Sequence, residues 1–283
     1  MIALAQRNIK LYFRNHTGVV MSLIGALISF FIYVFFLQEN LSSSWSSVTN
    51  ITPMLDAWMI GGTLAITGIT TAFAVMGQLV SDRSNDVSWD FQMTAMSPLK
   101  ISLSYFLSTA LASFVMQVIV FAIMATYFSI QDELTLSANM AWSLLVVTIA
   151  NTIFSTVLSQ LIVEFINTHT IYSRIATLIG TLTGFLVATY MPMGLLSTDA
   201  QRFIKLFPGA YVAASYREIL MHHYVNSDIP DTMRDEFTKF LGVKLSINDH
   251  LLTISNNLWL IFAVSLVGLI AYVIINRLKY KQD

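Results

Sequence analysis

The chain has no cysteine and little charge. Of its 283 residues, 11% are charged and 55% are apolar, whereas a soluble domain carries roughly 25% charged residues. This composition excludes a disordered chain, a basic nucleic-acid-binding protein and an ordinary cytosolic enzyme. Without cysteine there is no disulfide scaffold, zinc ribbon, thiol nucleophile or iron–sulfur site. The composition therefore predicts an integral membrane protein that contacts membrane lipid and binds no nucleic acid.

Motifs for nucleotide binding and catalysis are also missing. The sequence contains no Gly-Lys pair, which excludes a phosphate-binding P-loop, and it contains neither G-x-S-x-G nor H-E-x-x-H. The neighbours His222 and His223 would point about 100° apart on a helix, which is a poor arrangement for sharing a metal ion. We therefore expect no enzyme activity, no cofactor and no metal in this chain. If ATP powers the protein, another chain binds it.

Six stretches are long enough to cross the roughly 30 Å of a bilayer core, and each lacks Lys, Arg, Asp and Glu. A membrane β-barrel would instead show short alternating segments. The sequence thus predicts one all-α membrane domain over residues 1–283. Its six predicted spans are Thr17–Leu37, Ala57–Val80, Ser102–Phe128, Trp142–Val163, Ile175–Leu196 and Leu258–Ile275.

The distribution of Lys and Arg predicts the orientation. If the N-terminus is cytoplasmic, the inside segments hold nine of these residues and the short outside loops, Gln38–Asp56 and Ser129–Ala141, hold none. We therefore expect a multi-pass protein of the plasma membrane with both termini in the cytoplasm. Residues 1–16 suit a basic interfacial helix, although a helix continuous with the first span is an alternative. Residues 197–257 form the large outer segment, in which we expect short helices capping the outer face.

The absence of charge within the predicted spans bears on mechanism. An ion-coupled transporter usually needs a carboxylate or a basic group in the bilayer, and here Glu164 and Arg174 sit only at a predicted cytoplasmic edge, where anchoring is the simpler interpretation. Uncharged polar residues do occur within the spans. They either line a translocation path or form interhelical hydrogen bonds, worth roughly 0.6 kcal/mol each. The candidate path residues are Thr67, Thr71, Gln117, Asn151 and Ser155.

The segment between the second and third predicted spans resembles a segment of a known family. Residues 78–98 read QLVSDRSNDVSWDFQMTAMSP, with Asp82-Arg83 leaving the second span and Ser97-Pro98 opening the third. This segment resembles the first cytoplasmic loop of ABC-2-type (type V) ABC exporter permeases, where an acidic–Arg pair, a short helix and a Ser/Thr-Pro follow in that order. The family often has a second acidic residue and a glycine after the pair, where this chain has Ser84-Asn85-Asp86.

A second match lies late in the chain. Leu182-Thr183-Gly184 is followed by Pro192, by Phe207-Pro208 and by Arg217. This order resembles the fifth span and the outer re-entrant region of the same family, including its Pro-x8-Arg spacing. With the six-span layout, the resemblance covers nearly the whole chain. It implies an outer gate region at Pro192, Phe207, Pro208 and Arg217.

The resemblance implies a permease subunit that works with a second permease chain, identical or paralogous, and with P-loop ATPase subunits that bind ATP and Mg. Residues 81–100 would be the cytoplasmic coupling loop seated on the ATPase. Aromatic and Met side chains beside carboxylates suit a protein interface; a helix lying on the membrane and a local Asp82–Arg83 ion pair are the alternatives. The implied coupling residues are Asp82, Arg83, Asp86, Trp89, Asp90, Phe91, Ser97 and Pro98.

The resemblance implies ATP-driven export. The uncharged predicted spans best suit a hydrophobic or amphipathic cargo such as a drug, toxin, peptide or lipid. Two alternatives remain open at this point. One is an ion-coupled secondary transporter, and the other is a structural or regulatory membrane protein.

Overall fold

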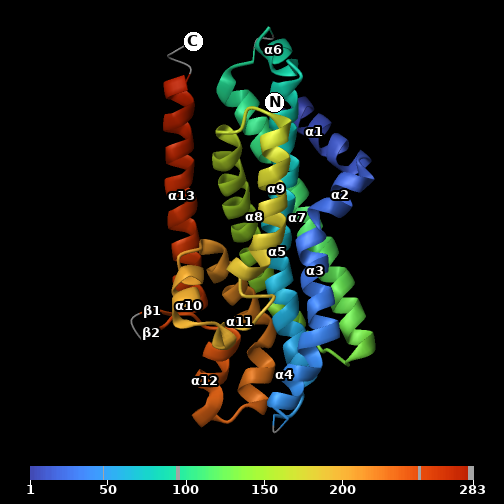
Figure 1. Cartoon of the computed structure of the whole chain (residues 1–283), viewed down its shortest axis with the longest axis vertical. Coiled ribbons are helices and arrows are strands. Elements are labelled where there is room, and N and C mark those ends of the chain that lie inside the picture. Colours follow the sequence, from blue (N-terminus) through green and yellow to red (C-terminus); the bar gives the residue numbers. More distant parts are fainter. Residues whose placement is uncertain (47, 94–95, 248–249, 280–283) are drawn as a thin grey trace.

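The computed structural model describes residues 1–46, 48–93, 96–247 and 250–279. The described chain is almost entirely helical, with one antiparallel pair of two-residue strands, so the predicted all-α class is confirmed (Figure 1). In chain order the elements are α1 (Ile2–Arg14), α2 (His16–Ser22), α3 (Ile24–Ile32), the π-helix η1 (Tyr33–Leu37), α4 (Gln38–Ser44), α5 (Ile51–Ser84), α6 (Val87–Gln92), α7 (Pro98–Gln131), η2 (Ala138–Met140), α8 (Ala141–Glu164), α9 (His169–Leu186), η3 (Met193–Leu195), α10 (Thr198–Lys205), α11 (Pro208–Asp228), α12 (Asp231–Leu241), β1 (Ser246–Ile247), β2 (His250–Leu251) and α13 (Ile254–Lys279).

Five helical segments in the described part of the chain are long and apolar enough to cross a membrane. They are the continuous helix Ile24–Ser44 and the helices α5, α7, α8 and α13. Large apolar side chains remain exposed on α7 and α13, among them Ile123, Ile130, Phe262 and Val267. Exposed apolar surface of this extent suits lipid rather than water. The transmembrane, helical character of the protein is therefore confirmed, whereas a count of six spans stays a prediction.

The helix α9 is shorter than the predicted fifth span, Ile175–Leu196, and is not among the five. It ends at Leu186, after which Ala188 adopts a left-handed conformation with φ 50°. The N–H groups of Thr189 and Tyr190 then turn back to the carbonyl of Gly184, at 2.9 and 3.3 Å. These bonds satisfy the end of the helix and reverse the chain, so the segment after Leu186 cannot continue along the same axis.

The predicted first span, Thr17–Leu37, is interrupted and displaced. The helix breaks at Leu23, between α2 and α3, and changes to π-helical geometry over Tyr33–Leu37 before continuing to Ser44. The segment that can cross a membrane therefore begins later and ends later than the sequence predicts.

The N-terminal helix α1 is separate from the first span. It ends at Arg14, and the next residue, Asn15, caps α2 by accepting the N–H of Gly18 at 2.9 Å. The helix predicted over residues 1–16 thus exists in its own right and does not continue into the first span. Its position at a membrane surface stays a prediction.

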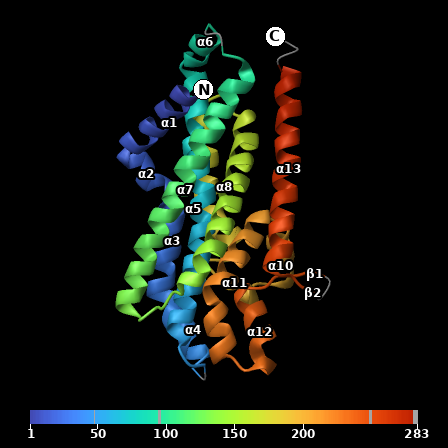
Figure 2. The ribbon, with the colours of Figure 1, turned by 180° about the vertical axis from the view of Figure 1, so that it is seen from behind.

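The central element is α5, which is buried along nearly all of its apolar length among α3, α7, α8, α9 and α11 (Figure 2). Glycines permit this close packing. A Cβ at Gly68 would lie 2.3 Å from Nδ2 of Asn151, and one at Gly61 would lie 2.9 Å from the backbone nitrogen of Arg217. With 34 residues, α5 is about 51 Å long. It therefore extends well beyond a hydrocarbon core of roughly 30 Å.

The elements divide between two ends of the molecule. The N-terminus, α6 and the last turns of α13 lie at one end, while α4, α10, α12 and the strand pair lie toward the other. The helix α11 differs from the expected surface helices of residues 197–257, because its side chains are mostly buried against α5, α8 and α13. Its sequence carries apolar residues on every face from Tyr211 to Met221, with Arg217 and Glu218 as the only charged residues between them, which explains the burial.

Candidate functional site

The last turn of α5 carries a buried carboxylate, Asp82, which is 2% exposed. Arg7 of α1 donates two hydrogen bonds to it, from Nη1 to Oδ2 at 2.8 Å and from Nη2 to Oδ1 at 2.9 Å. Gln78 donates a third at 2.7 Å, and the hydroxyl of Tyr105 on α7 donates a fourth at 2.5 Å. The bond to Asp82 raises the pKa of Arg7 and outweighs the partial burial of the guanidinium. Asp82 therefore joins α1, α5 and α7.

The neighbouring residue Arg83 pairs in another direction, because successive side chains on an α-helix point about 100° apart. Its Nη2 lies 2.8 Å from Oε2 of Glu164, and its Nη1 donates to the carbonyl of Val163 at 3.3 Å. Glu164 ends α8 and is 2% exposed, so it is a buried partner of Arg83. Asp82 and Arg83 do not pair with each other; each binds a different helix.

The helix α6 follows α5 after a tight turn in which Asp86 has a positive φ of 60°. The guanidinium of Arg7 lies 5.6 Å from the ring centroid of Phe91, so a single arginine contacts both α6 and Asp82. Phe91 and Met96 pack against an apolar core to which α1, α5, α7 and α8 contribute buried residues. These contacts connect α6 to the same helices that the ion pairs hold.

The other predicted coupling residues lie around α6. Asp90 is exposed, and Met93 is 89% exposed. Ser97 is the extended N-cap residue of α7, and Pro98 occupies the first position of that helix, where the missing N–H has no cost. The side chain of Trp89 lies outside the described part of the structure. The exposed groups on this end are thus the ones that another protein can reach.

Three predicted path residues meet in a buried network between α7, α8 and α11. Asn151 donates to Oε1 of Gln117 at 2.8 Å, and Ser155 donates to Oδ1 of Asn151 at 3.1 Å. Gln117 donates to Thr152 at 2.9 Å and accepts from the hydroxyl of Tyr216 at 3.0 Å. Gln117, Asn151 and Ser155 are at most 1% exposed. Their hydrogen bonds hold the helices together, and a role in a translocation path stays a prediction.

The remaining two path residues, Thr67 and Thr71, lie on α5 and are fully buried. Thr67 donates to the carbonyl of Thr63 at 2.8 Å, one turn earlier. Neither threonine lines the groove between α1–α3 and α9.

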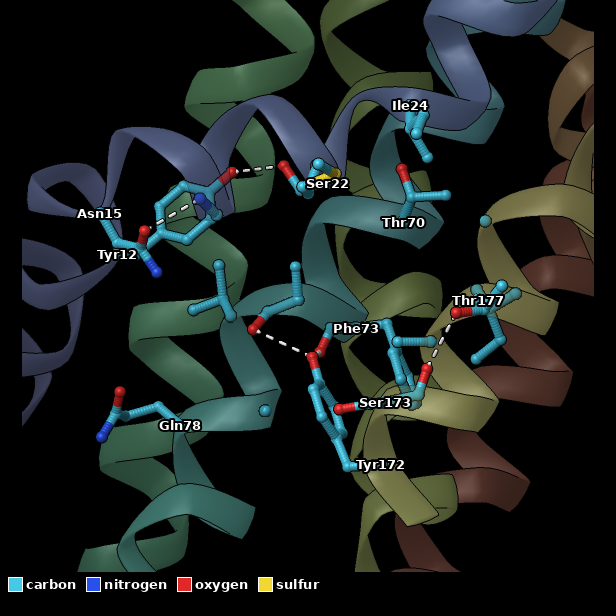
Figure 3. Close-up of a pocket in the computed structure, with 18 of the residues that line it drawn as sticks. Tyr12, Asn15, Ser22, Ile24, Thr70, Phe73, Gln78, Tyr172, Ser173 and Thr177 are labelled. Carbon is cyan, nitrogen blue, oxygen red and sulfur yellow. Dashed lines mark hydrogen bonds between the residues drawn. The ribbon is translucent and has the colours of Figure 1, made fainter. Parts of the chain in front are cut away.

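That groove has a volume of about 650 Å³ and lies between the N-terminal helices α1–α3 and α9, with α5 as its floor (Figure 3). No Lys, Arg, Asp or Glu is among its described lining residues. Its volume lies within the roughly 300–1,000 Å³ of small-molecule sites. The hydroxyl of Tyr172 donates to the carbonyl of Phe73 at 3.1 Å and fixes α9 to the floor. Polar lining residues include Asn8, Asn15, Gln78, Ser173 and Thr177.

The groove borders directly on the Asp82 cluster. Gln78 both lines the groove and donates to Asp82. Asn8, which is 1% exposed, accepts from Arg7 at 2.9 Å through Oδ1. Its Nδ2 has no hydrogen-bond partner among the described residues. A buried donor without an acceptor costs about 1–3 kcal/mol, so Asn8 is an energetically unfavourable point between the groove and the Asp82 cluster.

At the other end, Arg217 of α11 is 1% exposed. It donates to the carbonyl of Ala188 at 2.9 Å and to Oγ1 of Thr189 at 3.0 Å, with longer bonds of 3.4 Å to the carbonyls of Trp58 and Gly242. Its guanidinium also lies 4.7 Å from the ring centroid of Trp58. Arg217 therefore connects α5, the turn after α9, α11 and the end of α12.

The other predicted gate residues precede Arg217 in the sequence. Pro192 is the N-cap residue of η3, Phe207 is that of α11, and Pro208 begins α11. The ring of Phe207 lies 6.4 Å from that of Phe154 on α8. All three residues thus lie at helix starts, and their gating role stays a prediction.

Asp56 was not among the residues that the sequence predicted to lie in a span or in a functional site. The predicted second span begins one residue later, at Ala57, and therefore contains no charge, whereas α5 begins at Ile51 and includes Asp56. This aspartate is 0% exposed. Pro53 indicates the earlier start of this helix, because proline is favoured in the first turn of a helix.

Comparisons with family models, with curated proteins and with solved structures found no match to this chain.

Proposed function

We propose that this chain is the membrane-spanning subunit of an ATP-driven ABC exporter, which moves a hydrophobic or amphipathic cargo out across the plasma membrane. One observation carries the proposal. The short helix α6 stands at one end of the molecule, next to two ion pairs. Arg7–Asp82 joins α1 to α5, Arg83–Glu164 joins α5 to α8, and the hydrogen bond from Tyr105 to Asp82 adds α7. A partner that displaced α6 would displace these four helices with it.

The groove supports a path for the cargo. One of its walls is α1–α3 and the other is α9, so a movement of α1 relative to α9 changes its width. Its described lining contains no Lys, Arg, Asp or Glu, which suits an apolar body. In this mechanism a P-loop ATPase subunit binds ATP and Mg, and a second permease chain faces the groove side of the first.

Purification in mild detergent tests the assignment. The tagged chain should elute with a stoichiometric P-loop ATPase, and ATP hydrolysis should rise when cargo is added. A double variant of exposed groups near α6, Asp90→Lys with Met93→Asp, should lose the ATPase and remain folded, because both side chains are exposed. The matched control is Asp235→Lys, an exposed change on α12 at the other end.

Two outcomes contradict the proposal. A chain that elutes without any ATPase at several detergent strengths removes the exporter assignment. An ATPase that binds the Asp90→Lys, Met93→Asp variant as well as it binds the unchanged chain removes α6 as the docking element.

The cytoplasmic position of both termini is part of the proposal and has its own test. Because the natural chain has no cysteine, single substitutions give labelling sites without background. In intact cells, a membrane-impermeant maleimide should label the Asp235→Cys variant on α12. It should label the Asp90→Cys variant on α6 only after permeabilisation. The opposite pattern would invert the topology.

An ion-coupled secondary transporter is the second candidate, and the buried carboxylate of Asp56 within α5 favours it. Reconstitution separates the two functions. Cargo movement driven by a pH gradient, in vesicles that contain this chain and no ATPase, would favour the secondary transporter.

A further inference from the structure

The beginning of α5 holds a buried acidic group without a cation. Asp56 is 0% exposed, and no Lys, Arg or His in the described part of the chain forms an ion pair with it. Its Oδ1 accepts hydrogen bonds from the hydroxyl of Tyr33 and from Nε2 of Gln38, at 3.0 Å for the latter. Its Oδ2 has no hydrogen-bond partner among the described residues. One oxygen of the carboxyl is thus saturated, and the other is buried and unpaired.

The π-helical turn η1 builds this arrangement. In an α-helix, residues five apart point about 140° away from each other. Here the backbone N–H of Gln38 bonds to the carbonyl of Tyr33, which is the i to i+5 bond of a π-helix. This turn brings Tyr33 and Gln38 to the same face, so both reach one oxygen of Asp56. Single π-helical turns often mark functional positions.

A second carboxyl, Asp132, stands at the same place. The amide nitrogen of Gln38 donates one hydrogen to Oδ1 of Asp56 and the other to Oδ2 of Asp132 at 3.1 Å. Asp132 caps the end of α7 and is half-buried. It therefore connects the buried Asp56 to the surrounding water.

The groups that face Asp56 from the neighbouring elements contribute no positive charge. Tyr33 and Gln38 come from η1 and α4, and Asp132 comes from α7; Glu39 and Glu133 on the same segments are exposed. On α11, the hydroxyl of Tyr224 binds Thr135 and the guanidinium of Arg217 binds carbonyls near Trp58. The described surroundings therefore leave the two carboxyls to share one site.

Two buried or half-buried carboxyls cannot both be ionised at close range without a large free-energy cost. We propose that Asp56 and Asp132 hold one proton between them, on the otherwise unpaired Oδ2 of Asp56, so that this end of α5 is a proton-binding site. The proton comes from solvent water by way of Asp132 and returns to it by the same route. This site does not depend on the exporter assignment.

Release of the proton has a structural consequence. With both carboxyls ionised, the two side chains repel each other, and their separation strains the Gln38 amide that bridges them. Because Gln38 lies on α4, Asp56 on α5 and Asp132 at the end of α7, loss of this bridge loosens the contact between these three elements. The site thus couples proton binding to the packing of the first span against the second and third.

Infrared spectroscopy of the purified protein tests the proposal. At neutral pH the spectrum should contain the C=O stretching band of a buried protonated carboxyl, which shifts on exchange into D₂O. The band should disappear in the Asp56→Asn variant, because Asn keeps the shape and the acceptor oxygen but has no carboxyl proton. It should be unchanged in Asp235→Asn, the exposed control. The Asp132→Asn variant, in which an isosteric amide replaces the half-buried partner, should shift or remove the band.

A thermal measurement gives an independent readout. The folded protein holds one more proton than the unfolded chain, so stability falls as pH rises. The Tm of the unchanged protein should therefore fall as pH rises above the ionisation range of an ordinary carboxyl, about pH 4, and this slope should be smaller in Asp56→Asn.

Three results overturn the proposal. The first is the absence of the carboxyl band in the unchanged protein, which needs no variant to fold. The second is a band that persists at full intensity in Asp56→Asn. The third is a rise in Tm on addition of Na⁺, lost in Asp56→Asn and unaccompanied by the band, which would assign the site to a metal cation.

Discussion

The Asp82→Ala variant is expected to be less stable than the unchanged protein by about 1–3 kcal/mol, because removing the buried carboxylate leaves the donors that bind it without an acceptor. Arg7 loses both of its charge-assisted hydrogen bonds, and Gln78 and Tyr105 lose their acceptor. The measurement is the unfolding free energy in detergent micelles, followed by tryptophan fluorescence. The Asp235→Ala variant, which removes an exposed carboxylate, should change stability by less than about 1 kcal/mol.

A double-mutant cycle measures the interaction energy between Arg7 and Asp82. Removing Arg7 and Asp82 together leaves no unpaired charge, so the double variant should be less destabilised than the sum of the two single variants by roughly 0.5–3 kcal/mol. Cargo-stimulated ATP hydrolysis should also be lost in Asp82→Ala while the chain still inserts into the membrane. Additive effects, together with unchanged cargo stimulation, would refute the role of Asp82 in connecting α1 to α5.

The Arg217→Ala variant is expected to lose about 3–5 kcal/mol for a different reason. It opens a cavity beside Trp58 and deprives the carbonyl of Ala188 and the hydroxyl of Thr189 of their donor. Arg217→Lys should recover little, since an ammonium group cannot match the planar fork of a guanidinium. The readout is Tm in detergent.

The exposed arginine Arg202 is the matched control for Arg217. It pairs only with exposed Asp199, at 3.4 Å, so Arg202→Ala should cost at most about 1 kcal/mol. An Arg217→Ala protein with the Tm of the Arg202→Ala protein would show that α11 does not need this arginine to stay packed.

The parts of the fold that depend on composition could be predicted from the sequence, because a bilayer demands long uncharged stretches and these are visible in the chain. Positions 57–80 and 102–128 therefore fall within α5 and α7. The end of α9 could not be predicted in the same way, because the turn depends on Tyr190 packing over Gly184, and hydropathy does not distinguish that turn from helix.

In the candidate site, too, the sequence identifies some residues but not the contacts that they make. The importance of Asp82 and Arg83 follows from their place in a motif, but their partners do not. Arg7 lies 75 positions from Asp82 and Glu164 lies 81 positions from Arg83, and nothing in a single sequence states which helices pack together. Asp56 was missed because a span boundary is set by hydropathy, whereas the start of the helix is set by backbone hydrogen bonds and by Pro53.

The burial of α11 against α5 also dictates how the protein can be assembled during synthesis. Arg217 and its acceptor Trp58 are separated by 159 positions, which corresponds to roughly 8–30 s of translation at 5–20 residues per second. During that interval the face of α5 that will receive α11, including Gly61 and Gly62, has no permanent neighbour. The nascent chain therefore needs a temporary occupant for this face, either lipid or the insertion machinery, until the last third of the protein has been made.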